Sequence, residues 1–139
     1  MTLAEMLRRD EGVVRHAYQD HLGYWTIGVG RLIDQRKGGG LSDDEIDYLL
    51  TNDIKRKTAE VAKALPWISE LNGARQAVLV GMAFQMGTEG LLKFKNTLAM
   101  VQAGDYEGAA KGMLQSLWAR QTPERAAQMA KQMRTGEWT

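Results

Sequence analysis

One short stretch of alternating side chains, residues 24–29, constrains the fold most, because the other apolar residues follow helical spacing. Three apolar side chains fall on one side of this stretch: Trp25, Ile27 and Val29. Thr26 falls on the other side, which is the pattern of a β-strand. Residues 20–23 have the composition of a turn, and a weaker strand pattern precedes them at about 15–19. The sequence therefore predicts a small antiparallel sheet, followed by a flexible polar loop over 36–40.

Helical patterns fill the remainder of the chain. Thr2 and Glu5 have the spacing of a capping box, and Gly12 ends the helix that they begin. A second capping box at 42–45 opens one long helix, which we expect to reach about residue 64. Four further helices are predicted from the same kind of spacing: over 75–86, 91–101, 106–118 and 123–133. The fold class is α+β, with a small N-terminal lobe, a long connecting helix and a helical C-terminal lobe.

The chain length of 139 residues is that of one ordinary domain. Within a single domain over 1–139, we expect the small lobe at 12–60. The helical lobe then comprises 61–139 together with the N-terminal helix 1–11.

Composition excludes several classes of protein. The chain has no cysteine, so it has no thiol nucleophile, disulfide scaffold or cysteine-ligated metal. His16 and His21 have no matching ligand set, and we expect them at the surface with no metal site. The net charge of +1 gives no support for nucleic-acid binding. No apolar run is long enough to span a membrane or to resemble a signal peptide, so we expect synthesis and folding in a cytoplasm.

Two acids and a hydroxyl in the small lobe form the candidate chemical site. Glu11 ends the first helix, where the partial negative charge of the helix disfavours an ionised carboxyl group. Asp20 sits at the predicted turn, and Thr26 begins the strand that returns from it. One protonated and one ionised carboxyl group are what hydrolysis of a glycosidic bond requires. Pairs of this kind are common in chains of this length, so the pattern alone leaves ordinary surface acids as an alternative.

Several blocks of the chain, taken in order, resemble the phage-type lysozymes, the endolysin muramidases of T-even and lambdoid phages. They cover nearly the whole chain: residues 5–12, 18–20, 23–30, 84–87, 94–97, 118–126 and 134–138. The resemblance implies that Glu11 is the general acid and that Asp20 is the second catalytic carboxylate. It implies that Thr26 helps to hold the attacking water, and that the reaction inverts the anomeric carbon.

The resemblance also implies a set of supporting positions. Four of them contact sugar along a cleft between the lobes: Leu32, Phe84, Thr97 and Gly112. Gly112 departs from the polar residue that is usual there. Arg125 matches the arginine that pairs with the catalytic glutamate, and Gln85 is a further supporting residue. We expect Trp118 and Trp138 to pack within the fold rather than to stack on sugar.

Two departures from the family pattern concern the small lobe. Arg31 stands where some relatives have a histidine that makes a structural ion pair, so we expect its replacement to affect stability rather than catalysis. The segment 33–41 is much shorter than in the largest relatives.

The expected function is that of an endolysin. It cleaves the β-1,4 bond between N-acetylmuramic acid and N-acetylglucosamine in peptidoglycan glycan strands, without cofactor or metal, and so lyses the host cell. We expect a monomer with no nucleic-acid partner and no stable membrane association. It would be made in the host cytoplasm and would act in the periplasm after a separate holin opens the membrane.

Two alternatives belong to other classes. A catalytically silent lysozyme fold would bind envelope glycan or a protein partner without cleavage. A nucleic-acid module would use Arg31, Arg36 and Lys37, and the near-neutral charge disfavours it.

Overall fold

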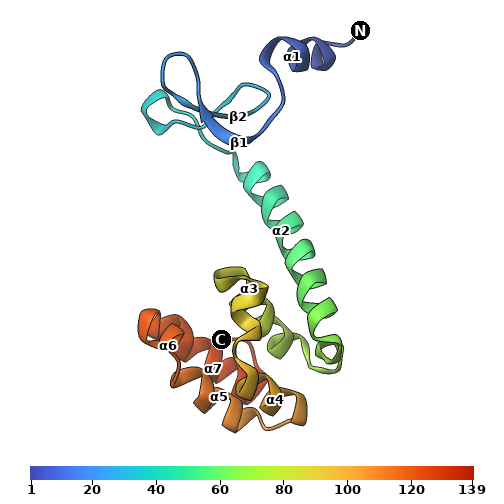
Figure 1. Cartoon of the computed structure of the whole chain (residues 1–139), viewed down its shortest axis with the longest axis vertical. Coiled ribbons are helices and arrows are strands. Elements are labelled where there is room, and N and C mark those ends of the chain that lie inside the picture. The colour runs from blue at the N-terminus through green and yellow to red at the C-terminus, as the bar shows by residue number, and fades with distance from the viewer. The chain divides into compact units, whose positions relative to one another are not determined.

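A computed structural model describes residues 1–139, with a small sheet near the N-terminus and helices over the remainder (Figure 1). The elements are, in chain order, α1 (Leu3–Glu11), β1 (Val14–Gln19), β2 (Trp25–Gly28), β3 (Arg31–Leu32), η1 (Gln35–Lys37), α2 (Asp43–Ala64), η2 (Pro66–Glu70), α3 (Gly73–Leu92), α4 (Lys95–Ala103), α5 (Tyr106–Leu114), α6 (Leu117–Gln121) and α7 (Pro123–Thr135). This order confirms the predicted α+β class.

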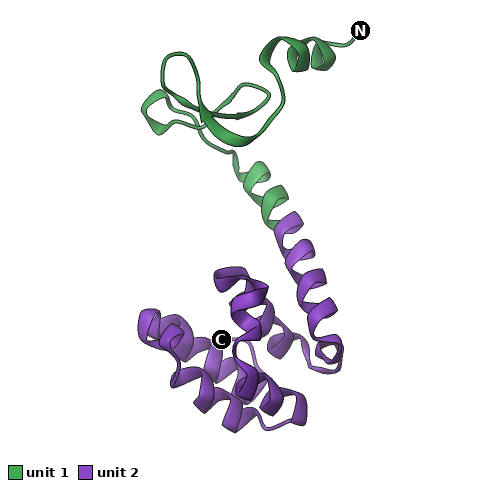
Figure 2. Cartoon of the chain, viewed as in Figure 1, with its two compact units in different colours: residues 1–50 green, residues 51–139 purple.

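The chain forms two compact units, Met1–Leu50 (unit 1) and Thr51–Thr139 (unit 2), and the boundary falls within α2 (Figure 2). The expected grouping of residues 1–11 with 61–139 stays a prediction.

Helix α1 begins and ends as its sequence predicts. The Thr2 hydroxyl accepts a hydrogen bond from the Glu5 amide at 3.1 Å, and the Glu5 carboxylate accepts one from the Thr2 amide at 2.7 Å. These two bonds are the reciprocal pairs of a capping box. Gly12 follows with a φ of 78°, a conformation that glycine adopts without steric cost. The Gly12 amide donates to the Arg8 carbonyl oxygen and so ends the last turn of the helix. Glu11 is therefore the last helical residue.

The three strands form one antiparallel sheet in the order β1-β2-β3. Thr26 is the central residue, because it lies opposite Tyr18 of β1 and opposite Leu32 of β3. Its side chain is 5% exposed, whereas that of the neighbouring Trp25 is 45% exposed. The polar side of the predicted alternation is thus the buried one. Strand β3 was not predicted, because two residues are too few to show a period.

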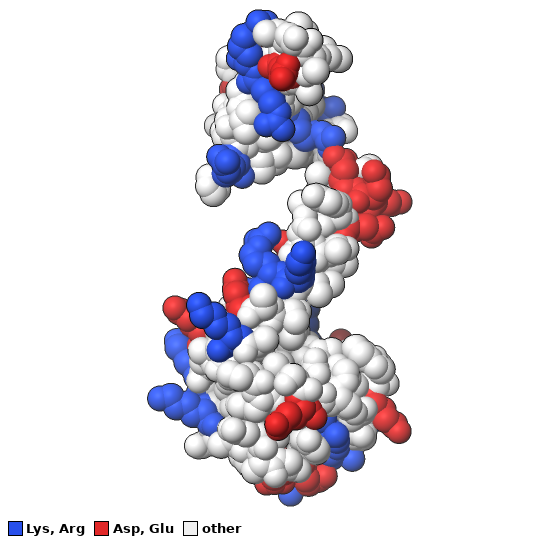
Figure 3. All heavy atoms as spheres, turned by 90° about the vertical axis from the view of Figure 1, so that its right-hand side faces the viewer, with Lys and Arg blue, Asp and Glu red and all other residues white.

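Helix α2 runs over the predicted span, and acidic side chains gather over its first turns, where Asp43, Asp44 and Glu45 lie (Figure 3). Carboxylates at this end of a helix interact favourably with its dipole. Glu45 completes the predicted capping box with Ser42 and also makes an ion pair with Arg31 at 2.6 Å. The Arg31 hydrogen bond and the Ser42 contacts lower the pKa of Glu45 to about 2. Arg31 therefore makes an ion pair at the position where, as the resemblance implies, a histidine makes one in some relatives.

The helical unit has the hydrophobic core of the molecule, and α3 supplies much of it. The fully buried large side chains are Val61, Val78, Leu79, Met82, Leu91, Val101, Met113 and Met133. Trp118 is buried, as predicted. Trp138 is 72% exposed, so the prediction that it packs is wrong; it follows Gly136, which caps the last helix.

Two helix boundaries in unit 2 differ from the prediction. Gly87 interrupts α3 at a φ of 80°, but a further helical turn follows, so α4 begins at Lys95 rather than at 91. The predicted helix 106–118 is divided at residues 115–116. The Ser116 hydroxyl accepts from the Ala119 amide at 3.1 Å and so caps a separate helix, α6.

The Thr122 side chain does not cap α7, because its hydroxyl donates to the Trp118 carbonyl oxygen at 3.0 Å. Pro123 opens the helix as predicted. No helix of the structure is both long enough and apolar enough to cross a bilayer.

Candidate active site

Glu11 lies against the turn between β2 and β3. A Cβ atom added to Gly30 would lie 3.0 Å from the Glu11 Oε2 atom and 3.3 Å from its carboxyl carbon. Gly30 has a φ of 63°, so both its backbone conformation and its missing side chain suit this position. The structure thus brings the end of α1 to the sheet within unit 1.

The Asp20 side chain is fixed by the turn that it begins. Its Oδ1 atom accepts hydrogen bonds from the Leu22 and Tyr24 amides, each at 2.9 Å. The Tyr24 amide bond is the strongest influence that lowers the pKa of Asp20, and the Leu22 bond acts in the same direction. Hydrogen bonds of this kind favour the charged form of a carboxyl group. Asp20 is therefore held as a carboxylate.

Thr26 shares an acceptor with Asp20. The Thr26 hydroxyl donates to the Tyr24 carbonyl oxygen at 3.0 Å, and the Asp20 amide donates to the same oxygen at 2.9 Å. This places the two residues on one hairpin. Because the hydroxyl proton is directed to the carbonyl oxygen, the lone pairs of Oγ1 are left to accept hydrogen bonds. Leu32, the fourth candidate in unit 1, is half-buried in β3 opposite Thr26.

Five candidates lie in unit 2 on four helices, and four of the five are on α3, α4 and α5. Phe84 and Gln85 are on α3, Thr97 is on α4 and Gly112 is on α5. Phe84 is 48% exposed and lines a small polar pocket with Asp53, Arg56, Lys57 and Glu60. The Gln85 side-chain oxygen accepts from the Trp118 indole N–H at 2.9 Å, and this bond fixes the orientation of the amide.

The structure brings Thr97 and Gly112 together. Thr97 is buried, and a Cβ atom on Gly112 would lie 2.7 Å from its hydroxyl oxygen. A residue with a side chain at 112 therefore requires Thr97 to move. Arg125 is exposed on α7, and its expected pairing with Glu11, which lies in the other unit, stays a prediction.

Asp34 and Arg36 are site residues that the sequence analysis missed, because residues 36–40 read as a flexible loop. The structure instead has the short helix η1, and the amide of its second residue, Arg36, donates to Asp34 Oδ1 at 2.9 Å. Asp34 is 5% exposed. An aspartate directly before the first helical residue is the local signal of such a cap, although it does not reveal burial. The structure contains no cluster of three or more metal-ligating side chains.

Comparison with known proteins identifies the family of the chain. A model of the phage lysozyme family matches residues 8–135. The chain belongs to the phage lysozyme family. This membership confirms the resemblance, the lysozyme fold and the assignment to a family of muramidases.

Individual relatives differ in how much of their length this lysozyme chain spans. Probable T4-type lysozyme 1 of Dictyostelium discoideum is 30% identical, and the match covers 97% of this chain and 95% of that protein. The pre-baseplate central spike protein Gp5 of Enterobacteria phage T4 is 35% identical over 98% of this chain, but over only 28% of its own length. Peptidoglycan hydrolase gp36 of Pseudomonas phage phiKMV is 28% identical over 84% of this chain and 13% of its own length.

The first two matches extend over 161 residues, which exceeds the 139 residues of this chain. The relatives therefore have residues that this lysozyme lacks. The expected shortening of the segment 33–41 stays a prediction.

We expect Gly30→Ala to lower lysozyme activity by about 10- to 100-fold, because small misplacements of a reacting group have effects of this size. The added Cβ atom would lie 3.0 Å from Glu11 Oε2 and would displace the carboxyl group. The measurement is the initial rate of reducing-end release from purified peptidoglycan. Gly28→Ala is the matched control, because Gly28, at the end of β2, has a similar φ of 70° but no neighbouring atom within 4 Å of the added carbon. Equal losses in the two variants would show that backbone strain, rather than contact with Glu11, is responsible.

Proposed function

We propose that this lysozyme hydrolyses the β-1,4 bond between N-acetylmuramic acid and N-acetylglucosamine in peptidoglycan. The observation that carries the proposal is the Asp20 hairpin, in which one turn holds a carboxylate and the acceptor side of a hydroxyl. Glycoside hydrolysis requires this ionised carboxylate in addition to a separate acid. The match to the family over residues 8–135 supports the same reaction.

In the proposed reaction, Glu11 donates its proton to the glycosidic oxygen as the bond to the anomeric carbon breaks. A water oxygen forms the new bond to that carbon, and Asp20 accepts the proton that the water loses. Thr26 accepts a hydrogen bond from the same water through Oγ1 and so orients it. The family resemblance implies inversion, which needs carboxyl groups about 6.5–9.5 Å apart, whereas retention needs about 5–5.5 Å.

The supporting roles are proposed from the same resemblance. Leu32 and Phe84 contact the sugar rings, and Arg125 pairs with Glu11. Gln85 contributes an amide whose orientation the Trp118 bond fixes. At the Thr97–Gly112 contact, the Thr97 hydroxyl fills the space that a side chain at 112 would need, and so supplies the polar group there.

We also propose the endolysin role, in which a monomer made in the host cytoplasm reaches the periplasm through a holin and lyses the cell. A nucleic-acid module is disfavoured, because two of the three cations that it would use are paired. Arg31 is paired with Glu45, and Arg36 with Asp34.

The decisive experiment digests purified Gram-negative peptidoglycan and reduces the products with borohydride. New ends recovered as the alcohol of N-acetylmuramic acid are expected. New ends on N-acetylglucosamine would contradict the proposed bond. Binding of the glycan without any new ends would identify a catalytically silent lysozyme fold instead.

A further inference from the structure

The shortened segment after β3 folds back onto β2 through Trp25. The amides of Ile33 and Asp34 both donate to the Trp25 carbonyl oxygen, at 2.9 and 3.2 Å. The Trp25 amide in turn donates to the Asp34 Oδ2 atom at 3.3 Å. The segment therefore binds both the carbonyl oxygen and the amide of Trp25, and the buried Asp34 takes part in both interactions.

Arg36 binds Asp34 with two nitrogen atoms. Its Nε atom is 2.9 Å from Oδ1, and its Nη2 atom is 2.6 Å from Oδ2. This bidentate pair holds the pKa of Asp34 far below its usual range. The Asp34 side chain is 4% exposed, so its negative charge would be unfavourable without a positively charged partner. The Arg36 side chain is 66% exposed and can contact other groups as well.

The exposed face of Arg36 contacts the turn that holds Asp20. Its Nη2 atom donates to the Gly23 carbonyl oxygen at 3.3 Å, and its guanidinium carbon lies 5.1 Å from the centre of the Tyr24 ring. Lys37 Nζ lies at the same distance from that ring centre. Cations at this distance are attracted to an aromatic ring.

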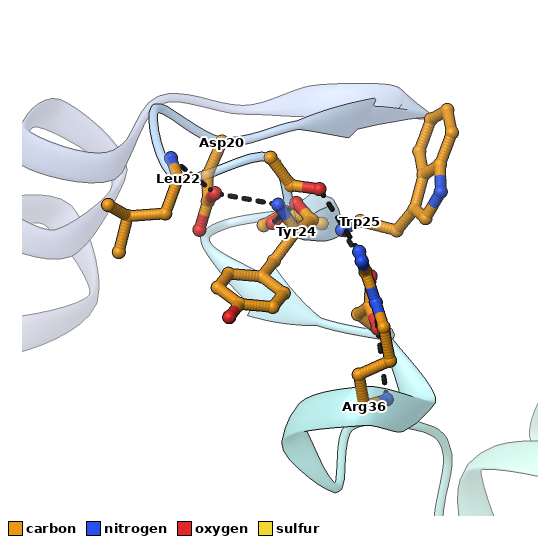
Figure 4. Close-up of polar contacts among 8 residues, drawn as sticks. Asp20, Leu22, Tyr24, Trp25 and Arg36 are labelled. Carbon is orange, nitrogen blue, oxygen red and sulfur yellow. Dashed lines mark hydrogen bonds and ion pairs between the residues drawn. The ribbon is translucent and has the colours of Figure 1, made fainter.

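Gly23 and Tyr24 are two of the three residues whose amides hold Asp20, and Leu22 is the third. The Gly23 amide donates to the Asp20 carbonyl oxygen at 2.9 Å, and the Tyr24 amide donates to Asp20 Oδ1. Gly23 has a φ of 83°, a conformation that glycine adopts without steric cost. Figure 4 follows these contacts from Asp20 through Tyr24 and Trp25 to Arg36.

We infer that Arg36, oriented by the buried Asp34, is a positioning residue that fixes the Asp20 carboxylate for glycan cleavage. The inference rests on the proposed function, because it gives Asp20 the water-activating role. In this lysozyme, the short segment 33–40 thus supports the catalytic turn as well as closing the sheet.

The test is Arg36→Gln, with carboxyl NMR used to follow the titration of Asp20 and reducing-end release measured as a function of pH. Loss of Arg36 loosens the turn and weakens the Tyr24 bond, so the pKa of Asp20 rises toward its ordinary value of 3.8. The acidic limb of the pH–rate profile moves in the same direction. We expect kcat to fall about 10-fold with KM within about twofold, because orientation rather than binding is lost.

Arg31→Gln is the matched control. It also removes an arginine from a 2.6 Å ion pair in unit 1, but this arginine makes no contact with the turn. Arg36→Lys keeps the positive charge and loses the two-pronged geometry, so it should restore folding stability without restoring the Asp20 titration. Tyr24→Leu removes the ring beneath Arg36 and leaves Asp34 paired, and it should shift the titration in the same direction.

An unchanged Asp20 titration in Arg36→Gln and Tyr24→Leu overturns the inference. An equal shift in Arg31→Gln also overturns it, because the effect would then be general to unit 1. Asp20→Asn separates this inference from the proposed function. Full activity of Asp20→Asn contradicts the catalytic role of Asp20. The NMR titration of Asp20 in Arg36→Gln still reports whether Arg36 controls the turn.

Discussion

Glu11→Gln is expected to lower the rate of peptidoglycan cleavage by about 10²–10⁴-fold, the usual contribution of general acid catalysis. Glutamine has nearly the same shape as glutamic acid, so it retains the packing against Gly30. It has no acidic proton to give to the glycosidic oxygen, so the leaving group departs as an unprotonated anion. The effect therefore appears in kcat, while KM changes little.

The measurement is turbidity clearing of permeabilised Gram-negative cells, together with reducing-end release from purified peptidoglycan. Asp10→Asn is the matched control, because Asp10 precedes Glu11 in α1 and makes only an exposed ion pair with Arg9. Pairs of this kind contribute little to stability. If Glu11→Gln clears cells as fast as the unmodified lysozyme, Glu11 is not the acid.

Leu79→Ala is expected to lower the free energy of unfolding by about 2–5 kcal/mol, the cost of emptying a fully buried leucine position. Leu79 lies on α3 and is 1% exposed. The truncation removes apolar contacts and leaves a cavity that the surrounding helices fill only in part. Urea denaturation followed by circular dichroism measures the change.

Leu114→Ala makes the same chemical change at a position that is 50% exposed on α5. We expect a loss of no more than about 0.5 kcal/mol there. Similar losses in the two variants would mean that α3 is not at the centre of the core.

Local signals predicted the elements that carry the candidate catalytic residues. The Thr2–Glu5 capping box and Gly12 set the ends of α1, and so placed Glu11 at its last residue. The alternation over 24–29 predicted β2. Capping and strand period depend on residues within a few positions of one another, so a sequence expresses them directly.

The missed features have no distinctive local pattern in the sequence. Strand β3 exists because Leu32 pairs with Thr26, and two residues show no period of their own. The break before α6 was missed because Ser116 and its neighbours also fit a continuous helical pattern. The expected packing of Trp138 was wrong because an apolar side chain near a chain end has no local signal of its exposure.

The sequence by itself determined the fold class, the family and the positions of Glu11, Asp20 and Thr26 on their elements, because these follow from short-range patterns and from resemblance. Only the tertiary structure decided that Gly30 adjoins the Glu11 carboxyl group, and that Asp34 is buried with Arg36 against the Asp20 turn. The alternating stretch at 24–29 predicted a strand, but burial of Thr26 in place of Trp25 was decided by its neighbours in β1 and β3. Contacts of this kind join residues that chain folding alone brings together, and no local periodicity encodes them.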